Sequence, residues 1–192
     1  GSSLGANALA VNAFVTTNSA AAAAGLCWAV LDWIFNEKPT VLGTATGAVA
    51  GLVAITPAAG FVSALSALAI GASVSVFCYV AVTVLKPKFG YDDALDVFGV
   101  HCVGGIWGAL ATGLFASKAV NPAGADGLFF GNPKLFLIQL AAVAATAAYS
   151  FAVSFVLYKI IDVTMKIRVT ERDEILGLDL TQHHENAYTV IE

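Results

Sequence analysis

Charged side chains are scarce in this sequence, and most of them sit in loops and at the C-terminal end. Only 11% of the 192 residues are Asp, Glu, Lys or Arg, whereas 58% are hydrophobic and the mean hydropathy is +0.82. A soluble domain carries about 25% charged residues. A soluble fold of this size cannot bury so much apolar surface, so we expect the chain to lie in a lipid bilayer.

Several functional classes lack their usual signals. There is no basic patch with interleaved aromatic residues, so we expect no nucleic-acid partner. Cys27, Cys78 and Cys102 lie in apolar stretches without CxxC spacing, which indicates buried free thiols. No GxSxG, HExxH or histidine-rich cluster is present, so we expect neither an enzyme nor a bound metal or cofactor.

The start of the chain also lacks the basic segment that precedes the apolar core of a signal peptide. Gly1 stands where a natural start has Met, and Ser2 leads directly into an apolar run. We therefore expect the sequence to begin partway through a longer protein.

Long apolar runs dominate what is present. A membrane-spanning helix needs roughly 20 apolar residues. Five candidates, separated by Pro, Gly and Asn-rich breaks, are 4–34, 40–57, 61–85, 94–116 and 134–162. The sequence predicts an all-α polytopic bundle, with residues 1–166 as the transmembrane domain and 167–192 as a polar tail.

Lysine and arginine indicate the orientation of this bundle, because cytoplasmic loops carry an excess of both. If five helices alternate, one side receives Lys38, Lys86, Lys88, Lys159, Lys166, Arg168 and Arg172, and the other receives Lys118 and Lys134. We therefore predict a cytoplasmic tail, with the N-terminal residues at the outer face of the plasma or inner membrane.

Small residues recur at four-residue spacing within the spans. Gly43, Gly47 and Gly51 form one such ridge, and Gly104 with Gly108 forms another. Such ridges let helix backbones approach closely inside a membrane. They indicate a compact bundle rather than a single anchor.

Polar residues also share a face of the first span, where Asn12, Thr16 and Ser19 recur at helical spacing. We interpret them as hydrogen-bond partners of neighbouring helices, and a place on a transport pathway is the alternative.

His101 is the one histidine inside a predicted span. A charged ring there would be costly, so we expect a neutral imidazole, which donates one hydrogen bond and accepts another. Such a ring in a narrow apolar pore binds a small polar solute or relays a proton. The pattern fits equally well a buried histidine bonded to a neighbouring helix.

Three carboxylates precede the His101 helix: Asp92, Asp93 and Asp96. Asp93 suits the N-cap and Asp96 the third helical position, near the positive end of the helix dipole. We predict a capping role, and a catalytic carboxylate pair is the alternative. In the tail, Thr170 with Asp173 could begin a short helix and Gly177 could end it.

Three segments together resemble the Amt/Mep ammonium transporters, which are relatives of the Rh proteins. They are residues 91–101 (YDDALDVFGVH), residues 51–60 (GLVAITPAAG) and the tail from Gly177-Leu178-Asp179 to Glu185-Asn186-Ala187-Tyr188. The resemblance covers nearly the whole chain. It implies an eleven-helix fold with two inverted five-helix repeats, of which this chain matches the seventh to eleventh helices.

The resemblance also implies roles for single residues. His101 matches the second of two pore histidines, Ser2 matches the serine that binds ammonium at the outer vestibule, and Thr56 matches a polar residue near the pore wall. The aromatic residues that complete the outer site and its phenylalanine gate would precede residue 1. Cys102 and His184 depart from the family, since both positions usually hold glycine.

The resemblance therefore implies ammonium or ammonia transport by a homotrimer in the membrane. The tail, including Gly177 and Asp179, would be regulatory, and a cytoplasmic P-II signalling protein would be a partner. The alternative function is an ammonium sensor that acts through its tail. From the residues alone the tail is either a solvated end or a docked segment, since Ile175, Leu176, Leu178 and Leu180 are apolar.

Overall fold

The computed structural model describes residues 3–186, and within these residues the chain is helical without any β-strand. The longer elements are α1 (Ala8–Asn36), α2 (Val41–Ile55), α3 (Ala64–Val80), α5 (Val103–Phe115) and α6 (Pro133–Met165). The shorter ones are η1 (Ala81–Leu85), α4 (Lys86–Phe89), η2 (Phe98–Cys102), η3 (Leu128–Phe130), α7 (Glu171–Leu176) and η4 (Asp179–His183).

Helix length and composition match the predicted membrane bundle. Four helical stretches are long and apolar enough to cross a membrane, namely Ala8–Asn36, Ala64–Phe89, Phe98–Phe115 and Pro133–Met165. The apolar helix Val41–Ile55 is shorter. The all-α class is confirmed, and the span at 40–57 is two residues shorter at its end because Thr56–Gly60 forms hydrogen-bonded turns around Pro57.

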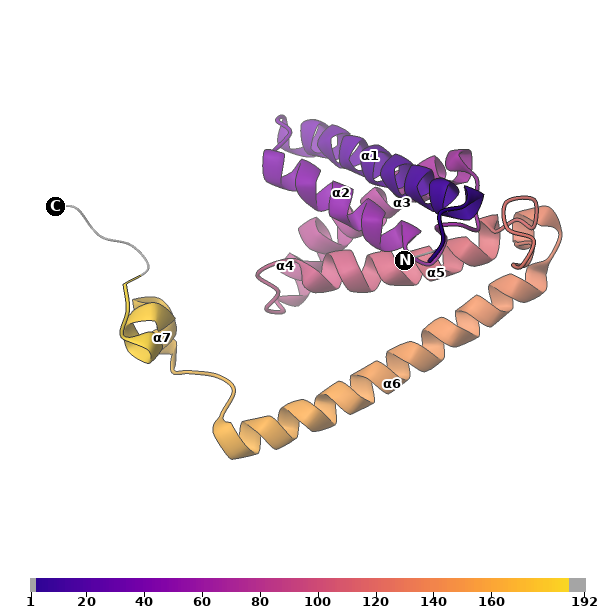
Figure 1. Cartoon of the computed structure of the whole chain (residues 1–192). Helices are drawn as coiled ribbons and strands as arrows, with labels where there is room; N and C mark the ends of the chain where they lie inside the picture. Colours follow the sequence, from indigo (N-terminus) through magenta and orange to yellow (C-terminus); the bar gives the residue numbers. More distant parts are fainter. Residues whose placement is uncertain (1–2, 187–192) are drawn as a thin grey trace. The chain divides into compact units, whose positions relative to one another are not determined.

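The chain divides into two compact units, Gly1–Ala144 and Ala145–Glu192, and α6 runs across the division between them. In the first unit α1 packs against α2 and α3, and α5 packs against α2 and α3 (Figure 1). The second unit holds the end of α6, then α7 and η4. The predicted domain boundary after residue 166 stays a prediction.

Close approach of backbones holds the first unit together. A Cβ added at Gly51 would lie 2.6 Å from the Ala20 carbonyl oxygen, and one at Gly108 would collide with the backbone of Ala54. Ala20, Ala50 and Ala54 are fully buried at these crossings. The predicted role of the glycine ridges in tight helix packing is therefore confirmed for these positions.

Side-chain oxygens cap the starts of α1, α2 and α3. Asn7 accepts a hydrogen bond from Ala10 N at 3.0 Å, which starts α1 four residues later than predicted. Thr40 caps α2 and Ser63 caps α3 in the same way. In the second unit Thr170 caps α7 through Asp173 N, and Gly177 follows its last residue, as predicted.

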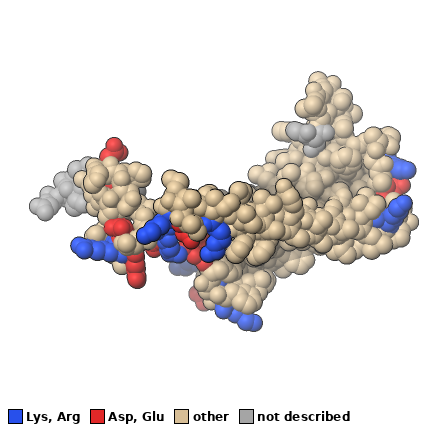
Figure 2. Space-filling view, turned by 90° about the horizontal axis from the view of Figure 1, so that it is seen from below, with Lys and Arg blue, Asp and Glu red and all other residues tan. Residues whose placement is uncertain are grey.

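Apolar surface dominates what the described residues expose. None of the residues of α6 is buried, and large apolar side chains along it are exposed. In Figure 2 wide stretches of the visible face carry no charged side chain. A surface of this kind is suited to lipid or to further protein rather than to water.

Candidate functional site

His101 lies in η2, a π-helical turn from Phe98 to Cys102 that leads directly into α5. Gly99 and Val100 of this turn are buried, whereas His101 and Cys102 are exposed. The imidazole therefore belongs to the surface of the first unit and not to its packed core.

The His101 turn is held at several points. Val103 N donates to the Phe98 carbonyl and so closes the π-helical turn, which is one residue wider than an α turn. The Cys78 thiol donates to the Val100 carbonyl at 3.8 Å. One turn further on, Trp107 Nε1 donates to Ser73 Oγ at 3.1 Å. These contacts tie the start of the α5 stretch to α3, so the backbone around His101 is fixed on its buried side.

The Asp93 side chain caps the start of the helical stretch that contains His101. Its Oδ1 accepts from Val97 N at 2.8 Å and its Oδ2 accepts from Phe98 N at 2.9 Å. One carboxylate thus pairs two backbone N–H groups that lack partners within the helix, at the positive end of its dipole.

Asp96 lies elsewhere than the sequence predicts. The helical stretch begins at Phe98, so Asp96 precedes it and adopts a left-handed backbone with φ 55°. Its Oδ1 lies 2.6 Å from Lys86 Nζ, which also donates to the Asp93 carbonyl at 2.6 Å. The capping-box arrangement is therefore wrong for Asp96, because the 93–96 segment forms a turn closed by the Asp96 N to Asp93 O bond.

The polar face of the first span also differs from its interpretation. Thr16 is fully buried, but its hydroxyl donates to the Asn12 and Ala13 carbonyls of its own helix. Among the described residues, buried Asn12 Oδ1 has no hydrogen-bond partner. Beside this face, a side-chain link between α1 and α3 comes from Ser75, whose hydroxyl donates to the Ala24 carbonyl at 2.6 Å.

A buried carboxylate that sequence reasoning missed lies near the end of α1. Asp32 is 5% exposed and accepts three hydrogen bonds from neutral donors. Asn36 Nδ2 donates at 3.1 Å, Thr40 N at 3.3 Å and Thr40 Oγ1 at 3.0 Å. Asn36 also donates to the Tyr79 hydroxyl at 3.2 Å. A carboxylate inside the first predicted span, with Asn at i+4, was the signal available.

Asp32, Asn36 and Tyr79 line a cavity of about 320 Å³ together with Thr46, Thr83 and Asp96. We call it the Asp32 pocket.

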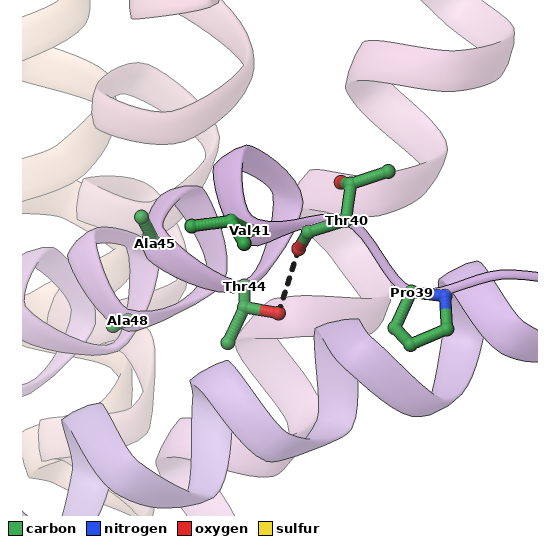
Figure 3. A pocket seen from close by; sticks show the side chains of 6 residues that line it. All are labelled: Pro39, Thr40, Val41, Thr44, Ala45 and Ala48. Carbon is green, nitrogen blue, oxygen red and sulfur yellow. Dashed lines mark hydrogen bonds between the residues drawn. The ribbon is translucent and has the colours of Figure 1, made fainter.

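A second hollow of about 470 Å³ lies on α2 and is lined by Pro39, Thr40, Val41, Thr44, Ala45 and Ala48 (Figure 3). Thr44 Oγ1 there donates to the Thr40 carbonyl at 2.8 Å, so its hydroxyl is already bonded within the helix. His101 lines neither cavity.

The remaining predicted site residues belong to separate parts of the sequence. Thr56 is exposed at the end of α2 and its hydroxyl donates to the Leu52 carbonyl at 2.7 Å. Ser2 lies outside the described residues. In the second unit Gly177 has φ 101°, and the Asp179 carbonyl accepts from Glu185 N at 2.9 Å. Within residues 3–186 no group of three His, Cys, Asp or Glu side chains could hold a metal ion.

Comparisons with known proteins agree on one family. The sequence model of the Ammonium Transporter Family matches residues 1–188. The ammonium transporter of Bacillus subtilis is 53% identical over 188 residues, which is 98% of this chain and 46% of the relative. Ammonium transporter Amt1 of Archaeoglobus fulgidus is 48% identical over 189 residues, covering 98% of this chain and 47% of the relative.

Solved structures support the same assignment. The crystal structure of Saccharomyces cerevisiae Mep2 superposes with a TM-score of 0.81 at 36% identity, covering 85% of this chain and 38% of that one. A protein described as Sensor Amt Protein superposes with a TM-score of 0.79 at 26% identity, covering 91% of this chain and 42% of that one. The chain spans about half the length of the curated relatives it matches, and it belongs to the Amt/Mep/Rh family of ammonium transporters.

Proposed function

We propose that this chain forms part of a membrane protein that carries ammonium or ammonia across the bilayer, with His101 as a pathway group. The observation that carries the proposal is the family match over residues 1–188, which includes the whole 91–101 motif. The exposure of His101 at the surface of the first unit supports it. A histidine on such a face can meet a second half of the protein and complete a pore with it.

The proposed chemistry follows from a neutral imidazole in an apolar surrounding. Such a ring accepts a hydrogen bond at one nitrogen and donates one at the other. It can therefore bind ammonia as it passes, after ammonium has released a proton at the entrance. A second histidine and the aromatic entrance residues would come from chain outside residues 1–192, and Ser2 would serve at the outer entrance. Thr56 would lie near the pore wall.

The assembly and the tail are further parts of the proposal. We expect a homotrimer in the cell membrane with the tail in the cytoplasm, because the side predicted to carry the tail holds most lysine and arginine residues. Gly177 and Asp179 would then belong to a regulatory segment. A cytoplasmic P-II signalling protein would be its partner.

A second candidate is an ammonium sensor that signals through the tail. The similarity to the protein described as Sensor Amt Protein favours it. In that case binding of ammonium would change the tail without sustained flux.

Uptake of isotopically labelled methylammonium separates these functions. A complete subunit that includes residues 1–192 would be reconstituted into sealed vesicles and compared with empty vesicles. The transporter proposal predicts saturable uptake that unlabelled ammonium competes away. Specific binding of ammonium without uptake would contradict it and favour the sensor.

A further inference from the structure

Two π-helical turns lie against each other on neighbouring helical stretches. One is η1, which continues α3, and the other is η2, which precedes α5 and contains His101. A π turn holds one residue more than an α turn, and such turns occur frequently at functional sites. Two of them in contact indicate a local geometry that ordinary helix packing does not provide.

Gly99 and Val82 form the contact between these turns. Gly99 is buried, and a Cβ added to it would lie 2.6 Å from Val82 Cγ2, 3.6 Å from Val82 N and 3.8 Å from Ala81 Cβ. Carbon atoms in contact are normally about 3.5–4.0 Å apart. Val82 cannot easily move aside, because a β-branched side chain has few rotamers in a helix. Gly99 thus permits an approach that alanine would prevent.

This contact lies two residues before His101. Val100, between them, is 3% exposed and its carbonyl accepts from the Cys78 thiol. Asp93 accepts hydrogen bonds from Val97 N and Phe98 N at the start of the turn. If the wide turn changed to an α turn, the residues on one side of it would rotate by about 100° relative to those on the other. The direction of the His101 side chain therefore depends on keeping this turn.

We propose that Gly99 and Val82 are positioning residues that hold the wide turn of His101 and so aim its imidazole. This inference rests on the proposed function, because it gives His101 a pathway role to be positioned for. Neither residue needs to touch ammonium. Their effect on transport passes through His101 alone.

The test uses substitutions in a complete subunit that includes residues 1–192. Gly99→Ala should lower methylammonium uptake or the preference for ammonium over potassium by about tenfold, since misplacement of about 1 Å can cost more than this. Val82→Ala should restore both readouts in the Gly99→Ala background, because it removes the methyl group that the new Cβ would meet. Gly105→Ala is the matched control, because a Cβ added at Gly105 meets nothing within 4 Å.

A double-mutant cycle separates positioning from general packing. Adding Gly99→Ala to His101→Leu should change uptake and selectivity no further, because the ring to be positioned is already gone. Normal transport by Gly99→Ala, or a double variant with Val82→Ala that inserts but stays impaired, would overturn the inference. If Gly99→Ala does not insert, the double variant alone decides it. Unaltered transport by His101→Leu would instead contradict the proposed function.

Discussion

Lys86 Nζ lies 2.6 Å from Asp96 Oδ1, so an ion pair joins the end of the α3 stretch to the turn that precedes the His101 helix. The lysine also holds the Asp93 carbonyl. Both side chains of the pair are a little over one quarter exposed, at 28% and 27%. A pair so open to solvent contributes little to stability, because water screens its charges. The carboxylate of Asp93, which caps the helix, is the stronger determinant of this segment.

Asp93→Ala should lower the free energy of unfolding by about 0.5–2 kcal/mol, because Val97 N and Phe98 N lose their acceptor. Ion selectivity of the protein that folds should stay normal. Thermal unfolding in detergent and uptake in vesicles measure the two effects. Asp96→Asn is the control, since it removes the charge pair and keeps a residue that tolerates the left-handed backbone. A selectivity change at normal stability in Asp93→Ala would contradict the capping role.

Asp32→Ala should destabilise the first unit by about 1–3 kcal/mol, because the variant loses the buried carboxylate that accepts hydrogen bonds from Asn36 and Thr40. Thr44→Val serves as the matched control on α2. It removes a hydroxyl that bonds within its own helix, so its effect should be below about 0.5 kcal/mol. The two variants would be compared by thermal unfolding in the same detergent. Equal midpoints would show that the Asp32 network contributes nothing to stability.

Arg168 lowers the pKa of Glu174 from its ordinary value of 4.5, because its guanidinium donates hydrogen bonds to that carboxylate. Because the pKa of Glu174 is lower in the folded tail, its pairing with Arg168 stabilises the folded tail fully above pH 4.5. This stabilisation is lost as the pH falls through the lowered pKa of the folded state. The pKa of Glu174, measured by following its carboxyl resonance by NMR against pH, should rise toward the ordinary value in Arg168→Met. Arg172→Met removes the same charge and should change it less. A larger effect of Arg172→Met would contradict the assigned pair.

Gly177→Asp should disturb the segment between α7 and η4. Gly177 has φ 101°, and a side chain there costs about 1–3 kcal/mol of local strain. If the tail is regulatory, this variant and truncation after Met165 should both lower uptake by the complete subunit while membrane insertion stays normal. Glu171→Ala, on the exposed side of α7, is the control. Wild-type flux from both altered tails would leave the segment as a solvated end.

Most of the helices and the caps at Asp93 and Thr170 could be predicted from the sequence because their signals are local. Apolar runs of sufficient length, Pro and Gly breaks, and the Thr170 cap act within a few residues of each other. The left-handed Asp96 could not be predicted in this way, since its partner Lys86 is ten residues away on another helix. The contact of Gly99 with Val82 could not be predicted either, because it depends on two π turns that have no sequence signature. The hydrogen bonds from Thr40 to Asp32 could not be predicted, because they depend on how the loop between α1 and α2 returns to the end of α1.

Ammonium selectivity of the complete subunit with His101→Leu tests the central claim most directly. Labelled methylammonium uptake would be measured in vesicles with and without excess potassium, beside wild type and the Gly105→Ala control. The account predicts that His101→Leu changes the uptake rate or lets potassium compete, while Gly105→Ala behaves as wild type. Unaltered rate and selectivity in His101→Leu would contradict a pathway role for this histidine.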